Sequence, residues 1–220
     1  MVSKLLLTVA SAATLLVARR AVRDWGATKS ECGSVLPGDD LGPDPTTVLT
    51  RAVTVKAPSE EVWRWLVQLG ENRGGSYGYQ KLEDVLGIDV PHADCVKPRW
   101  QHLVEGDQVV LVGPGRFGGP DAVAHSVITV VPQRTIVLVS DERNEVRSFH
   151  IRLQGPDTCR LVSRRRSARS RGWERIVAEL FEPVDLLATR QLLLGIKAHA
   201  EASVRRNGAV PMIAAALEGR

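Results

Sequence analysis

Two tyrosines and two histidines are the side chains of this 220-residue sequence whose type and spacing could polarise a small molecule. Tyr77 and Tyr79, the only tyrosines, follow a glycine-rich stretch, where a phenol could hydrogen-bond a ligand or pack a helix onto a sheet. His125 alternates with valines and is expected to face inward, as a core histidine rather than a catalytic one. His150 alternates with Phe149, so we expect it to face solvent, which disfavours a general-base role for it.

Arginines form the second group with chemical potential. Arg164 and Arg166 alternate with Val162 in a β-like run, and an inward-facing arginine could bind a carboxylate through two hydrogen bonds. A solvated sheet edge is an equally good interpretation. Residues 163–175 hold six arginines against one glutamate, and Trp173 is the only aromatic residue among them. This composition favours attraction to an anionic membrane surface over nucleic-acid binding.

The sequence contains no nucleophile–base–acid set, paired carboxylate motif or phosphate-binding loop, so no catalytic residue is identified. His92 lies near Asp94 and Cys95, but no second histidine or cysteine follows at a metal-ligand interval. Cys32, Cys95 and Cys159 are odd in number and widely spaced, which argues for a reducing compartment. We therefore expect no metal and no cofactor, and any catalysis would depend on cavity shape and scattered polar groups.

The N-terminus departs most from the globular composition of the chain, which is 44% hydrophobic and 25% charged with a net charge of +4. Residues 5–18 carry no charge, Lys4 precedes them, and Arg19 and Arg20 follow. A membrane anchor, a helix packed on the protein or on a bilayer, and a cleaved secretory signal all fit this pattern. The positive C-terminal flank of an anchor would place the domain in the cytoplasm. The alternatives are a secreted protein and a soluble cytoplasmic one.

Hydrophobic periodicity predicts the elements that position these residues. Gly, Pro and Asp over residues 25–49 indicate a linker, after which a strand begins at Thr50. A helix capped by Ser59 buries Trp65, and a long last helix begins at Pro183 and ends at Gly208. A short helix is expected over 82–86, and further strands over 108–112, 123–131, 135–140, 146–153 and 158–166.

The order of these elements is strand, helix, helix, strands and long helix. Strands that follow one another without crossover helices pair as an antiparallel meander. A curved antiparallel sheet around a long C-terminal helix encloses a space that either side chains or a ligand must fill.

Short words in the same order carry a resemblance to a known family, and they extend roughly from Trp25 to Ala200. They are Trp25-Gly26-Ala27-Thr28, Leu36-Pro37-Gly38-Asp39, Ala57-Pro58-Ser59-Glu60-Glu61-Val62-Trp63, Trp65-Leu66-Val67-Gln68-Leu69-Gly70, Arg73-Gly74-Gly75, Tyr77-Gly78-Tyr79, Gly106-Asp107, Ser148-Phe149-His150 and Leu193-Leu194-Gly195-Ile196-Lys197. The sequence resembles the START-like (SRPBCC) superfamily of polyketide cyclase/dehydrase-like proteins, most closely a bacterial branch with an N-terminal hydrophobic segment. Arg164 and Arg166 resemble an arginine pair of these relatives. The resemblance implies the helix-grip fold and a hydrophobic cavity, but no particular reaction.

The expected architecture is an α+β helix-grip domain over 50–207, preceded by a hydrophobic helix over 1–24 and the linker, and followed by a tail over 208–220. We expect it to bind or carry an apolar, lipid- or polyketide-like molecule at or near a membrane. The alternatives are an aromatase/cyclase- or dehydratase-like enzyme and a structural protein with a filled interior. No nucleic-acid partner is expected, and the oligomeric state stays open. The candidate cavity residues are Trp65, Gln68, Arg73, Tyr77, Tyr79, Trp100, His125, Phe149, Arg164 and Arg166.

Overall fold

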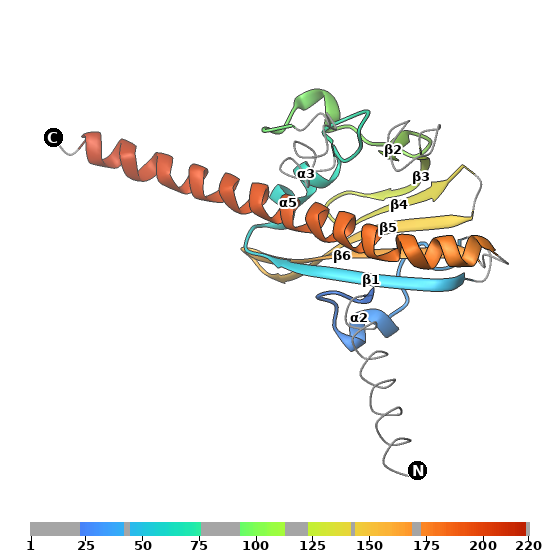
Figure 1. Cartoon of the computed structure of the whole chain (residues 1–220). Coiled ribbons are helices and arrows are strands. Elements are labelled where there is room, and N and C mark those ends of the chain that lie inside the picture. The colour runs from blue at the N-terminus through green and yellow to red at the C-terminus, as the bar shows by residue number, and fades with distance from the viewer. Residues whose placement is uncertain are drawn as a thin grey trace, which may run out of the picture.

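A six-stranded antiparallel sheet and one long helix dominate the computed structural model, which describes residues 23–41, 45–75, 93–112, 123–141, 144–168 and 173–218 (Figure 1). The strand order is β1-β6-β5-β4-β3-β2, so the first and last strands of the chain are neighbours. The strands are β1 (Pro45–Val55), β2 (Gln108–Val112), β3 (Val123–Val131), β4 (Thr135–Ser140), β5 (Glu145–Gly155) and β6 (Thr158–Ala168). The helices are α2 (Lys29–Gly33), α3 (Ser59–Leu66), the 3-10 turn η1 (Pro98–Trp100) and α5 (Trp173–Glu218).

The predicted meander is confirmed, and three strands have the bounds that alternation predicts, β2, β3 and β4. All five neighbouring pairs are antiparallel. The remaining strands are longer than predicted because their polar ends also pair: Glu145 of β5 lies opposite Ser167 of β6. Pairing with a neighbour, rather than hydrophobicity, therefore sets the ends of these strands.

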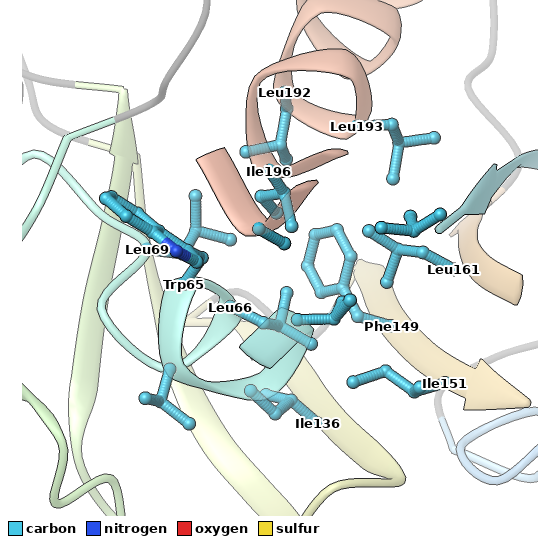
Figure 2. Close-up of a cluster of buried hydrophobic side chains, with 14 of the residues drawn as sticks. Trp65, Leu66, Leu69, Ile136, Phe149, Ile151, Leu161, Leu192, Leu193 and Ile196 are labelled. Carbon is cyan, nitrogen blue, oxygen red and sulfur yellow. The ribbon is translucent and has the colours of Figure 1, made fainter. Parts of the chain in front are cut away.

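The sheet has an inner face, which contacts α3 and α5, and an outer face. Figure 1 shows α5 running along the sheet and α2 on the other side of β1. Residues of α3 and α5 pack into one apolar cluster with the inner face, in which Phe149, Leu193 and Ile196 are fully buried. Figure 2 shows Ile196 and Leu192 of α5 facing Phe149 of β5 and Leu66 of α3. This cluster is called the apolar half of the inner face below.

Residues 23–41, called the strap below, cover the outer face and border the edge strand β1. The main-chain N–H of Ala52 donates to the Trp25 carbonyl oxygen at 3.1 Å, which protects an otherwise open sheet edge. On the outer face, Leu36 packs with Ala52 and Val162. The linker predicted over 25–49 therefore differs from the structure. Glycine and proline here shape tight turns in a packed segment: Gly38 has φ of +92°, which glycine adopts readily, and Val137 leaves no room for a side chain there.

Two helix boundaries also differ from the predictions. Helix α5 begins at Trp173 and continues through Pro183 and Gly208 to Glu218. Proline removes one main-chain donor and glycine costs about 1 kcal/mol, and a helix of 46 residues tolerates both. At α3 the N-cap is Pro58 and makes no side-chain cap bond. The predicted cap, Ser59, instead has its hydroxyl 3.4 Å from Gln133. Within the described part of the chain, no helix is apolar over a length that would cross a membrane.

Candidate functional site

Alternation along β5 divides the inner face of the sheet into two chemically different halves. Phe149 and Ile151 belong to the apolar half, whereas Arg147 and Glu145 follow on the same face toward the start of the strand. Helix α5 shows the same order, because Ile196 and Leu192 lie over the apolar half and Asp185 contacts Arg147. The inner face therefore changes from apolar to charged along one direction.

The charged half, called the ionic cluster below, is centred on the carboxylate of Asp185. Three strands each contribute one arginine to it: Asp185 lies 2.6 Å from Arg51 of β1, 3.0 Å from Arg147 of β5 and 3.4 Å from Arg165 of β6. The second carboxylate, Glu145, lies 3.1 Å from Arg147 and 2.6 Å from Arg165. Thr189, one turn after Asp185 on α5, accepts a hydrogen bond from Arg51 at 2.8 Å.

The charged groups of the cluster shift one another's pKa values. Burial opposes ionisation of both carboxyl groups, but the positive charge of Arg147, with that of Arg165, outweighs it and lowers the pKa of Asp185 and of Glu145. Burial likewise opposes the charge of Arg147, yet Glu145 and Asp185 raise its pKa. Burial lowers the pKa of Arg51; the charge of Asp185 opposes this, and the charges of Arg147 and Arg165 add to it. The two buried arginines thus differ, because the pKa of Arg147 is raised and that of Arg51 is lowered.

Two buried side chains in this half keep polar atoms without a partner among the described residues. Nη2 of Arg51 makes no hydrogen bond, although that side chain is only 2% exposed. Nδ1 of His125 makes no hydrogen bond to a described residue, and its Nε2 lies 3.4 Å from Glu145, a long contact for a hydrogen bond. Buried polar groups without a partner are rare in folded proteins, so each indicates a missing acceptor or donor.

Of the predicted cavity residues, Trp65, Phe149 and His125 lie on the inner side. Phe149 is fully buried in the apolar half, and Trp65 stacks on His199 of α5 with 4.3 Å between ring centroids. His125 contacts Glu145 and so faces inward, in the direction that alternation predicts.

Arg164 and Arg166 lie on the outer face instead. Arg164 uses all five of its N–H groups on Thr50, Asp39 and three main-chain oxygens of the strap, at Glu31, Cys32 and Ser34. Arg166 lies 3.4 Å from Asp39. The residue between them, Arg165, is the one that faces inward. A strand has a period of two, so choosing the wrong neighbour reverses the face.

Gln68, Arg73 and Trp100 meet at a third place, the loop that contains η1. Gln68 is fully buried and accepts a hydrogen bond from the Lys97 N–H at 3.2 Å. Arg73 donates to the Trp100 carbonyl oxygen at 2.7 Å, and the Arg99 guanidinium lies 4.3 Å from the centre of the Trp100 ring. These contacts hold the loop against α3. Tyr77, Tyr79, His92 and the helix expected over 82–86 lie outside the described residues.

The prediction that His150 faces solvent is wrong. Its side chain is 3% exposed on the outer face, where its Nδ1 lies 3.2 Å from Thr135 and its Nε2 2.9 Å from Ser148. Burial, together with the charges of Arg152 and Arg164, lowers its pKa to about 4. Alternation correctly placed His150 on the face opposite Phe149, but the strap covers that outer face and excludes solvent from it.

Sequence reasoning missed most of the ionic cluster. The signal for Arg147 was present, because it lies two residues before Phe149 on the same strand face. No pattern of comparable strength marked Arg51 and Asp185, which are 134 residues apart. Among the described residues no group of histidine, cysteine and carboxylate side chains could hold a metal ion.

Comparisons with known proteins give matches to solved structures alone. No family model and no curated protein matches the sequence. The Zhui aromatase/cyclase from Streptomyces sp. R1128 is 17% identical, with 74% of this chain and 98% of that chain covered and a TM-score of 0.41. A Polyketide_cyc-like protein from Corynebacterium glutamicum is 14% identical, with 72% and 94% covered and a TM-score of 0.39. The Aha1 dimer from Colwellia psychrerythraea is 13% identical, with 68% and 98% covered and a TM-score of 0.38.

Likenesses with scores this low carry no argument about function, and the architecture is assigned from the chain itself. The six-stranded antiparallel order, the helix α3 between β1 and β2, and the long helix α5 packed on the inner face are the arrangement expected above. The chain therefore has the α+β helix-grip fold.

Proposed function

We propose that this protein binds or carries an apolar small molecule between the inner face of the sheet and α5, at or near a membrane. The observation that carries the proposal is the division of the inner face, where buried charges and a continuous apolar cluster lie under one helix. A core that served stability alone would gain little from these charges, because desolvating buried ions offsets most of their attraction.

The affinity for such a ligand would come mainly from apolar area. Each Å² of apolar surface removed from water contributes about 25 cal/mol, so a ligand that buries about 300 Å² gains about 7 kcal/mol before the costs of association. The inner face is lined by aliphatic and aromatic side chains, such as Leu161, Phe149 and Ile196, which are already fully buried, so a ligand would have to take the place of part of this packing.

Support for the membrane part comes from the sequence. The uncharged residues 5–18 with basic residues on both sides suit an anchor or an interfacial helix, and they precede the strap directly. An apolar ligand is scarcely soluble in water, so a carrier held at a bilayer could exchange it with the lipid phase.

Uptake from vesicles tests this function. The full chain, stripped of lipid, is incubated with phosphatidylcholine/phosphatidylglycerol vesicles that contain free fatty acids, then re-isolated, extracted and analysed by mass spectrometry. We expect a retained apolar compound in stoichiometric amount. A wild-type protein that emerges empty would overturn the proposal.

A matched pair of serine variants locates the uptake. Ser163 is buried on the inner face between Leu161 and Arg165, so Ser163→Leu should abolish retention at a cost in stability of about 1–3 kcal/mol. Ser126→Leu, on the opposite face, should retain the compound. For the membrane part, a full chain with Leu6→Arg and Leu15→Arg should no longer float with the vesicles; unchanged flotation would contradict that part alone.

A further inference from the structure

We infer that the ionic cluster binds the carboxylate of the ligand, which makes the preferred ligand a long-chain carboxylic acid whose tail lies along the apolar half. This inference rests on the proposed function and deepens it. Arg51, Arg147 and Arg165 are the residues that would recognise the acid.

Charge balance is the first argument. The cluster contains three guanidinium groups, Arg51, Arg147 and Arg165, and two carboxylates, Glu145 and Asp185. Among the residues that the structure describes, one positive charge is therefore in excess in a largely buried setting, where an uncompensated charge is costly. A single carboxylate would balance it, whereas a phosphate monoester, with a charge of about −1.5 to −2, would overcompensate it.

The cluster also contains an example of the contact that we propose. Asp185 lies within 3.4 Å of all three arginines and is held as a ligand carboxylate would be. Asp185 and Thr189 accept hydrogen bonds from Nη1 of Arg51 and from no other nitrogen of that side chain. The buried Nη2 of Arg51 therefore lacks an acceptor among the described residues, and the carboxylate of a ligand can supply one.

The geometry of α5 sets the length of the ligand. Asp185, Thr189, Leu193 and Ile196 follow one another along the side of the helix that faces the sheet. At 1.5 Å per residue, the distance from Asp185 to Ile196 is about 16 Å, the length of a long hydrocarbon tail, which would replace part of the packing around the fully buried Leu193 and Ile196. Strand β6 has the same arrangement, because Leu161 belongs to the apolar half and Arg165, four residues later on the same face, belongs to the ionic cluster.

The cluster is also reachable from solvent. The side chain of Arg165 is 29% exposed, whereas that of Arg51 is 2% exposed. A carboxylate could therefore approach at Arg165 and complete its hydrogen bonds at the buried Arg51. Bidentate contacts of this kind favour a planar carboxylate over a neutral ester or alcohol.

Comparison of an acid with its own ester tests the inference on the full chain. Affinities for tetradecanoate, its methyl ester and tetradecyl phosphate are measured by displacement of a fluorescent apolar probe. Charge-assisted hydrogen bonds contribute about 1.5–3 kcal/mol, so the acid should bind roughly 10- to 100-fold more tightly than the ester. If acid and ester both fail to bind, the proposed function fails. If they bind equally, or if tetradecyl phosphate binds most tightly, this inference alone fails.

Neighbouring arginines of β6 provide the matched variants. Arg165→Gln should reduce the preference for acid over ester about tenfold and leave the affinity for the ester unchanged. Arg166→Gln, one residue further on the outer face, should keep the full preference. Arg51→Lys keeps the charge but removes the guanidinium fork, and it should also reduce the preference. Each variant is first shown to melt cooperatively, and equal preferences in Arg165→Gln and Arg166→Gln would overturn the assignment.

Discussion

The two faces of the sheet each hold three arginines with two carboxylates, yet the arginines are held differently. On the outer face, Arg160, Arg164 and Arg166 meet Glu31 and Asp39 of the strap. On the inner face, the ionic cluster has the same composition. A ratio of charges alone therefore does not distinguish a structural cluster from a binding one.

The difference lies in the remaining acceptors. Main-chain oxygens of the strap accept from two arginines of the outer cluster: Gly26 accepts from Arg160, and Glu31, Cys32 and Ser34 accept from Arg164. Two buried atoms of that cluster, Nε of Arg166 and Oδ1 of Asp39, make no hydrogen bond within the described part of the chain, and the Arg166 side chain is 21% exposed. On the inner face, Arg51 donates one hydrogen bond to the strap, at the Arg23 carbonyl oxygen, and its unpartnered Nη2 belongs to a side chain that is 2% exposed. The outer cluster thus holds the strap through four main-chain oxygens, whereas the inner one has an unpartnered nitrogen on its most deeply buried arginine.

Among the changes that test this difference, removal of Arg164 should cause the largest loss of stability. Arg164→Met removes one donor each from the Asp39 carboxylate and from three carbonyl oxygens, and it breaks a buried ion pair, so we expect a loss of about 3–5 kcal/mol in the free energy of unfolding, measured by urea denaturation. The protein that remains folded should keep its preference for acid over ester. A loss of that preference without a loss of stability would reverse the roles assigned to the two faces.

Protonation of His150 at low pH should cause the next largest loss of stability. Its pKa in the folded protein is about 4, below the ordinary value of 6.5, so between these values the unfolded chain binds more protons. The contribution of the neutral His150 to the free energy of unfolding is therefore fully present above pH 6.5 and is lost as the pH falls. About 2 kcal/mol should be lost between about pH 6.5 and 5.

His150→Gln should remove this slope, as followed by urea denaturation at several pH values. The control is His102→Gln at an exposed position, which should retain it. The lowered pKa of Glu31, about 2, affects stability only below about pH 4.5 and does not interfere. A slope that survives His150→Gln would show that the strap does not keep this histidine neutral.

Two glycines of the strap provide the smallest predicted effect. A Cβ at Gly38 would lie 2.7 Å from Val137 Cγ1 at a φ of +92°, so Gly38→Ala should cost about 1–2 kcal/mol. Gly33, in α2, has open space around its Cβ position, and Gly33→Ala should be neutral or slightly stabilising. Thermal unfolding compares the two, and equal melting temperatures would show that the strap does not press on β4.

Much of the fold could be predicted from the sequence, because its signals are local. Alternation gave β2, β3 and β4 with their bounds, and helical spacing gave the buried residues Leu193, Ile196 and Ala200 of α5. The strap could not be predicted, because its glycines and prolines have the composition of a linker. Its order depends on partners far along the chain, such as Arg164, which lies 125 residues from Asp39.

The candidate site shows the same division at single residues. By itself the sequence determined that neighbouring arginines of β6 point to opposite faces, since a strand alternates with a period of two. Only the tertiary structure decided that Arg165 meets Asp185 under α5 while Arg164 meets the strap. The physical reason is that alternation leaves two equivalent assignments, and the choice between them depends on contacts with other elements, such as that of Arg164 with Asp39, which lies 125 residues away.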